Sequence, residues 1–238
     1  MKNRVFWVIA ALCILSSGIQ AQVQSGDSLY ALRLDLGYSY NKTYSHHFNA
    51  DIGAFVPINR HFELQADVRL SSANFYTAAT QLRPKFPLKV GELYIETRAA
   101  YRAIVRNNIQ EATGGLSLGY RMQYINVQIG CGMRVFGPYG MKYHSSDRFI
   151  LEPFIVLYRV EAFVRPQTSR WNIAMAIGNI DNWQMERMWQ PIFMLVGRFD
   201  ADRHWRVYLS SECKPTGMFH LNAAFYAADL RAGVEYRF

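Results

Sequence analysis

The sequence predicts an all-β fold, a closed antiparallel sheet that crosses a lipid bilayer, and three observations predict it. Half of the residues are hydrophobic and 15% are aromatic, yet past the amino-terminal segment they form no run of membrane-helix length. Segments of about ten residues alternate between apolar and polar side chains, as in a β-strand. Polar turn residues separate these segments. We therefore expect about twelve strands, with ten as the alternative, in an up-and-down meander.

The amino-terminal segment is typical of an export signal. Lys2 and Arg4 precede an apolar run at residues 5–15, which is followed by small residues. A basic start, a short apolar run and a small-residue exit are the pattern of a secretory signal peptide. The run is shorter than the roughly 20 residues of a spanning helix. We expect residues 1–21 to be the signal peptide and residues 22–238 to form the barrel domain.

The last strand shows the strictest alternation. Its apolar face carries Leu230, Val234, Tyr236 and Phe238, and charged residues occupy most of the opposite face. A terminal Phe preceded by Tyr two residues earlier, after such an alternation, resembles the carboxy-terminal signature of bacterial outer-membrane β-barrels. The resemblance implies that these four residues form the signal read by the barrel-assembly machinery. It also implies an outer-membrane location with outer-membrane lipids as neighbours.

The remaining strands follow from the same alternation. We expect them at residues 29–40, 47–56, 62–70, 73–82, 92–105, 112–122, 124–136, 149–164, 171–179, 189–199 and 204–213, and the last from 219 or 225 to 238. A tight reversal is expected at residues 57–60. Residues 83–89 contain two prolines, so we expect them to break the ladder and form a long turn.

Charge and cysteine content limit the partners. The formal net charge of +8 becomes +6 (8 − 2) when Lys2 and Arg4 are removed with the signal peptide. Because export is predicted, we expect anionic lipids or small anionic solutes as partners and no nucleic acid. Cys131 and Cys213 are too few for a disulfide scaffold. The sequence contains no recognisable metal or cofactor motif, so we expect none.

The polar faces of the strands are rich in arginine, which predicts a charged lumen. A small porin-like channel would use such arginines to favour anionic solutes. The candidate lumen residues are Arg98, Arg102, Arg121, Arg134 and Arg206. The alternative is that these arginines pair with carboxylates and fill the lumen, because unpaired buried charge is costly. The candidate carboxylates are Glu63, Asp67, Glu96 and Glu212.

Two other classes of function stay open at this point. A lipid hydrolase or acyltransferase would need a nucleophile and a base held together. The residues available toward the external side are His46, His47, His144, Ser145, Ser146, Asp147 and His220, with no diagnostic spacing. A structural or adhesive barrel would instead present a loop, with Lys142, Tyr143 and His144 as its contact surface. A secreted β-sandwich also alternates, but it does not need so many charges on one face.

Overall fold

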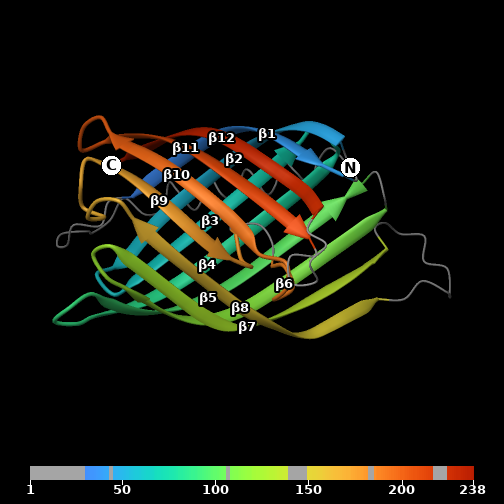
Figure 1. The fold of residues 1–238 in the computed structure, drawn as a ribbon, viewed down its shortest axis with the longest axis horizontal. Coiled ribbons are helices and arrows are strands. Elements are labelled where there is room, and N and C mark those ends of the chain that lie inside the picture. Colours follow the sequence, from blue (N-terminus) through green and yellow to red (C-terminus); the bar gives the residue numbers. More distant parts are fainter. Residues whose placement is uncertain (1–29, 43–44, 106–107, 139–148, 182–184, 217–223) are drawn as a thin grey trace.

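The computed structural model describes residues 30–42, 45–105, 108–138, 149–181, 185–216 and 224–238. They form one closed barrel of twelve antiparallel strands, in which each strand lies beside the next along the chain (Figure 1). The strands are β1 Ala31–Asn41, β2 Ser45–Asn59, β3 Phe62–Ser71, β4 Phe75–Pro87, β5 Glu92–Ile104, β6 Ile109–Arg121, β7 Ile125–Pro138, β8 Ile150–Phe163, β9 Trp171–Gly178, β10 Ile192–Asp200, β11 Trp205–Thr216 and β12 Ala224–Arg237. The predicted strand number and the meander are confirmed. No helix among the described residues is long and apolar enough to cross a membrane.

The barrel closes where the first strand meets the last. One edge of β1 pairs with β12, with Ala31 opposite Arg237, and its other edge pairs with β2. Beyond this ladder, the Phe238 amide donates a hydrogen bond of 2.8 Å to the Tyr30 carbonyl. Tyr30 and Phe238 therefore lie at the same end of the barrel, which we call the terminal end, and the opposite end is the loop end. Closure pairs the strand edges, as a sheet in lipid requires.

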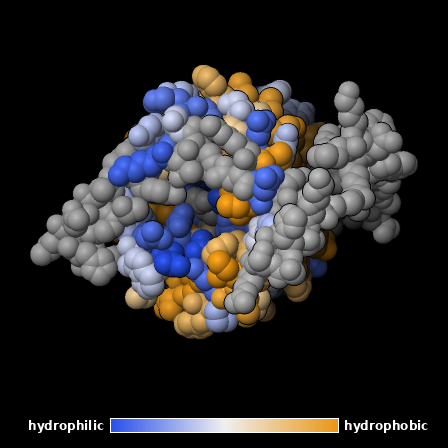
Figure 2. Space-filling view, turned by 90° about the vertical axis from the view of Figure 1, so that its right-hand side faces the viewer, coloured by the Kyte–Doolittle hydropathy of each residue, from blue (hydrophilic) through white to orange (hydrophobic). Residues whose placement is uncertain are grey.

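Side chains alternate between the outside of the barrel and its lumen. On β1, Leu34 is 55% exposed and Leu36 is 65% exposed, whereas Asp35 between them is 3% exposed. On β9 the burial switches at every residue. Figure 2, which looks onto the loop end, shows hydrophobic side chains on the outer surface and hydrophilic ones around a central hollow. The predicted faces are confirmed, and their arrangement is that of a barrel in lipid with a polar interior.

The structure corrects two predicted turns. β4 continues through Pro84 to Pro87, so the following connection spans only residues 88–91. Pro84 has no amide hydrogen, and β4 lacks bridges to β5 at this point, but the register on both sides of the gap is unchanged. β2 likewise continues past Pro57, where the ladder to β3 shifts register, and it ends at Asn59. At each proline the strand pairing is disturbed only locally, and it continues beyond the proline.

The two ends of the barrel differ in their connections. The terminal end has the connections 60–61, 88–91, 122–124, 164–170 and 201–204. At the loop end, β9 and β10 are joined by residues 179–191, of which 182–184 lie outside the described residues. Residues 179–181, Met185 and Pro191 of this connection are buried, with Asn179 and Ile180 at 0% exposure, whereas residues 187–189 are exposed. We call residues 179–181, 185 and 186 the inward segment, because they contact the lumen wall or line the lumen.

Candidate functional site: the charged lumen

A cluster of buried ion pairs joins four strands across the lumen. The Arg69 guanidinium binds both carboxylate oxygens of Asp51, at 2.7 and 2.6 Å, and its third nitrogen lies 3.3 Å from Asp229. Arg231 contacts the same Asp229 at 2.8 Å and Glu212 at 2.7 Å. Side chains of these five residues are at most 11% exposed. Charge this far from water is tolerable only in such shared pairs.

Side chains in the lumen also stabilise the closure between the first and last strands. The Arg69–Asp229 pair runs from β3 to β12, past β2 and β1. The Tyr208 hydroxyl on β11 donates a hydrogen bond to the Asp35 carboxylate on β1, past β12. Closure therefore rests on side-chain contacts inside the lumen as well as on the β1–β12 ladder.

A second cluster lies on β3, β4 and β5. Arg83 contacts Glu63 at 2.5 Å and Glu96 at 2.6 Å. Lys85 contacts Glu63 at 2.8 Å, and Arg98 pairs with Glu96. Each carboxylate has two cationic partners, and Arg83 is shared between them. The cluster therefore holds three cations against two carboxylates.

The inward segment is fixed by the side chain of Asn179. Its amide nitrogen donates to the carbonyls of Val156, at 2.6 Å, and Glu186, at 2.8 Å. Its amide oxygen accepts a hydrogen bond of 2.8 Å from the Tyr158 amide. One side chain thus satisfies backbone groups of both β8 and the segment itself, which fixes the point where the chain turns into the lumen.

Charged residues of the wall also contact the segment. Arg98 donates a hydrogen bond of 2.6 Å to the Asp181 carbonyl, and Lys214 pairs with the Asp181 carboxylate at 2.8 Å. Arg134 donates at 3.3 Å to the Met185 carbonyl. The segment therefore binds to three different strands, β5, β7 and β11.

The apolar part of the segment packs on a patch of the lumen wall that we call the seat. It is formed by Gly115, Gly132, Ile155 and Leu157. Ile180 and Met185 contact Ile155 and Leu157 of β8 in one buried cluster. Met185 lies against Gly115 of β6 and Gly132 of β7: a Cβ added to either glycine would come within 2.8 and 2.7 Å of the Met185 side chain. The glycines therefore make the space that the segment occupies.

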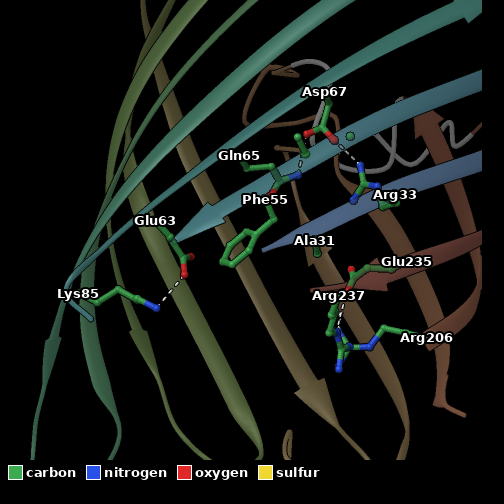
Figure 3. Close-up of a pocket in the computed structure, with 12 residues that line it drawn as sticks. Ala31, Arg33, Phe55, Glu63, Gln65, Asp67, Lys85, Arg206, Glu235 and Arg237 are labelled. Carbon is green, nitrogen blue, oxygen red and sulfur yellow. Dashed lines mark hydrogen bonds and ion pairs between the residues drawn. The ribbon is translucent and has the colours of Figure 1, made fainter. Parts of the chain in front are cut away.

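Two of the cavities among the described residues lie at opposite ends of the lumen. The terminal-end cavity is about 350 Å³ and is lined by Arg33, Phe55, Lys85, Arg206 and other residues (Figure 3). The loop-end cavity is about 280 Å³ and is lined in part by Arg102, Arg134, Glu111 and Glu186. The two share no lining residue, and the buried carboxylates Asp35 and Asp51, which face each other on β1 and β2, line neither.

The five candidate arginines occupy different parts of the lumen. Arg102 and Arg134 lie together, each 3.9 Å from Glu111, and Arg134 also contacts Glu152 at 2.5 Å. The other three are separate from this pair: Arg98 contacts the inward segment, Arg206 lines the terminal-end cavity 2.6 Å from Asp200, and Arg121 lies 3.5 Å from Glu92 near the rim. Each has a carboxylate partner.

The other predicted site residues are placed as follows. Leu230, Val234 and Phe238 are 40–57% exposed on the outside of the barrel, and Tyr236 stacks edge-on against Phe238 at 5.0 Å between ring centroids. His46 is exposed whereas His47 is buried, so the two histidines point to opposite faces of β2. Residues 142–147 and His220 lie outside the described residues.

Sequence reasoning missed the residues that narrow the lumen. Arg69 and Arg231 lie on the polar faces of their strands, but nothing in the sequence separates them from the other lumen arginines. Leu157 breaks the pattern: it shares its phase with the charged Arg159 and Glu161 and yet is apolar. An apolar residue in this phase indicates that the lumen wall at Leu157 is covered by another part of the chain.

Solved structures share this architecture. The translocator domain of the autotransporter NalP from Neisseria meningitidis has a TM-score of 0.54 at 10% identity, over 98% of this chain and 96% of that one. The NanC porin has a TM-score of 0.53 at 10% identity, over 86% and 100%. An outer membrane channel from Pseudomonas putida F1 has a TM-score of 0.56 at 9% identity, over 91% and 100%.

The fold is that of an outer-membrane β-barrel. No family model and no curated protein matches the chain. At identities of 10% or less the structural neighbours show the fold alone, so the activity has to be argued from the lumen.

Proposed function

We propose that this protein is a narrow solute channel of the bacterial outer membrane, exported by its signal peptide, in which the inward segment sets the constriction. The observation that carries the proposal is the inward segment itself, which is bound to the wall and lines the loop-end cavity with Asp181 and Glu186, while a second cavity opens toward the terminal end. A barrel of this size leaves an interior far narrower than that of a sixteen-stranded porin. The neighbours that are porins and channels support the same class.

We further propose small anionic solutes as permeants, selected at the terminal-end cavity. Its lining includes the four cationic residues Arg33, Lys85, Arg206 and Arg237 and the three acidic residues Glu63, Asp67 and Glu235. The loop-end cavity has no such excess, because its acidic residues outnumber its cationic ones. Arg102 and Arg134, which line it, are therefore expected to influence selectivity less than Arg206.

The test is single-channel conductance of the refolded protein in planar bilayers, with reversal potentials measured in a salt gradient. Arg206→Gln should shift the reversal potential toward cations, and Glu235→Gln in the same cavity should shift it toward anions. Arg134→Gln, at the other cavity, should shift it less than Arg206→Gln. Equal shifts from Arg206 and Arg134 would contradict the assignment of selectivity to the terminal-end cavity.

A sealed structural barrel is the second candidate, and the buried layer of Asp35, Asp51 and Arg69 favours it. Asp35 and Asp51 line neither cavity, Arg69 lines the loop-end cavity next to them, and all three are at most 7% exposed. A correctly folded protein that never conducts, even when the inward segment is displaced by mutation, would support this candidate. Lipid-hydrolase assays would then be the next measurement.

A further inference from the structure

The turns at the terminal end carry a strong excess of positive charge. They contain the exposed residues Arg60, Lys89, Arg165, Arg170 and Arg203, and Asp202 is the one acidic side chain in these five connections. A set of cations at one rim, without matching carboxylates, is not explained by the pairing that organises the lumen.

Two of these turns are built on the same four-residue pattern. Residues 59–62 are Asn-Arg-His-Phe and residues 202–205 are Asp-Arg-His-Trp. In each, the first side chain accepts a hydrogen bond from the histidine amide, at 2.8 and 2.7 Å. In each, the arginine Nε donates to the histidine Nε2, at 2.9 and 2.8 Å.

The histidine ring in both turns is fixed by a neighbouring strand. His61 Nδ1 lies 3.2 Å from the Lys85 carbonyl, and His204 Nδ1 lies 2.8 Å from the Arg237 carbonyl. A carbonyl only accepts hydrogen bonds, so Nδ1 carries the proton and Nε2 is left to accept from the arginine. Each guanidinium is thereby held through Nε, and within the described part of the chain its two Nη groups have no hydrogen-bond acceptor.

The other two rim arginines lie over aromatic rings, and Arg170 also donates hydrogen bonds of 2.9 Å to the carbonyls of Asp200 and Ala201. The Arg165 guanidinium lies 3.7 Å from the Trp171 ring centroid, and that of Arg170 lies 5.1 Å from the Phe199 ring centroid. Trp171 is 37% exposed and Phe199 is 42% exposed on the outer face. Exposed aromatic side chains at strand ends mark the level of the lipid headgroups. The cations therefore lie at that level and not out in the aqueous phase.

We propose that this rim binds the phosphate groups of anionic phospholipids in the adjacent leaflet. Two free Nη groups in a fixed plane match the two non-bridging oxygens of a phosphodiester. A soluble acidic protein would fit less well, because the arginines adjoin the lipid-exposed rings of Phe62, Trp171 and Trp205. The inference rests on the membrane location proposed above, but it does not require the barrel to conduct.

The experiment is tryptophan quenching by brominated lipids in vesicles that contain the refolded full chain. Trp171 and Trp205 lie at the rim and report its nearest lipids when the other three tryptophans, Trp7, Trp183 and Trp189, are replaced by Phe. Brominated phosphatidylglycerol should quench more strongly than brominated phosphatidylcholine at equal mole fraction, and salt should reduce the difference. In Arg60→Gln/Arg203→Gln the preference for the anionic lipid should fall by up to about fivefold per arginine removed.

The controls separate the rim from general electrostatics. Lys42→Gln removes an exposed cation at the loop end and should leave the preference unchanged. In the described part of the chain, the hydrogen bonds that Arg60 and Arg203 donate go to their histidines, so the double variant should fold, as heat-modifiable migration in electrophoresis will show. Insertion without lipid preference, or a preference that survives in the double variant, would overturn the proposal. Failure of the wild type to insert into either vesicle would instead contradict the membrane location.

Discussion

The lumen is filled in different ways along two parts of its wall. The wall of β1–β3, β11 and β12, which we call the charged wall, is closed by ion pairs centred on Arg69 and Arg231. The seat on β6–β8 is apolar and glycine-rich, and the inward segment covers it. A charged wall can be built from strands alone if partners meet in register. A seat of small residues leaves a space that another part of the chain has to fill.

The largest effect is expected when the charged wall loses its central cation. Arg69→Met leaves Asp51 and Asp229 buried without their shared partner. We expect a loss of about 3–5 kcal/mol in the free energy of unfolding, as when one member of a buried pair is removed. Urea titration of the refolded barrel measures it. Arg69→Met/Asp51→Asn should recover part of the loss, and no recovery would show that the pair is not the source of the stability.

The seat should be sensitive to volume and insensitive to charge. Gly115→Leu would place side-chain atoms on Met185 and Leu157, with the Cβ alone only 2.8 and 2.9 Å from them. We expect about 1–3 kcal/mol of destabilisation from overpacking, together with displacement of the inward segment and a higher single-channel conductance.

The neighbouring glycine supplies the control for this prediction. Gly114 lies on the opposite face of the same strand, and a Cβ there would have no heavy atom within 4 Å. Gly114→Leu should therefore leave both stability and conductance close to those of the wild type. Equal effects at Gly114 and Gly115 would mean that the change acts on β6 itself and not on the seat.

A smaller effect is expected at the hinge of the inward segment. Asn179→Ala removes the groups that bind Tyr158, Val156 and Glu186, which leaves buried backbone groups unpaired at a cost of about 1–3 kcal/mol. Conductance should become larger or noisier.

Asn172 is a matched control at the other end of the barrel. Its side-chain amide binds the backbone of Arg165 and Pro166 in the 164–170 turn. Asn172→Ala should lower stability to a similar extent but leave conductance unchanged. An effect of both variants on conductance would contradict a specific role of the segment in the constriction.

The smallest effect is expected from a charge outside the lumen. The Trp205 and His204 amides donate to Asp202 at 2.7 Å each, and these hydrogen bonds lower the pKa of the exposed carboxyl. The stabilisation is therefore present above the pKa that Asp202 has in the unfolded chain and is lost as the pH falls through its lower, folded value.

Asn59 provides the neutral comparison, because it makes the same contact to the His61 amide. Asp202→Asn should leave stability at pH 7 nearly unchanged and remove a small part of the decline on acidification, measured by urea titration between neutral and acidic pH. A loss at pH 7 as large as that of Arg69→Met would show that charges outside the lumen matter as much as those of the charged wall.

The alternation of side chains predicted the strands and their faces because it is a local property. Leu34 and Asp35 point to opposite sides whatever lies across the barrel, and the two-residue period is enough to place them. The same local rule misjudged residues 83–89, where Pro84 suggested a break. There the ladder on either side of the proline fixes the strand, and the sequence of one strand does not contain that information.

Alternation along the sequence thus predicted about twelve strands, with ten as the alternative, in a meander with a polar lumen. Only the closed barrel shows which charges meet, such as Arg69 with Asp229, and that residues 179–181 and Met185 are buried against the lumen wall. The physical reason is that partners across a lumen are set by the stagger between strands and by the closure of β1 on β12. Residues 160 positions apart become neighbours only when the whole sheet has closed.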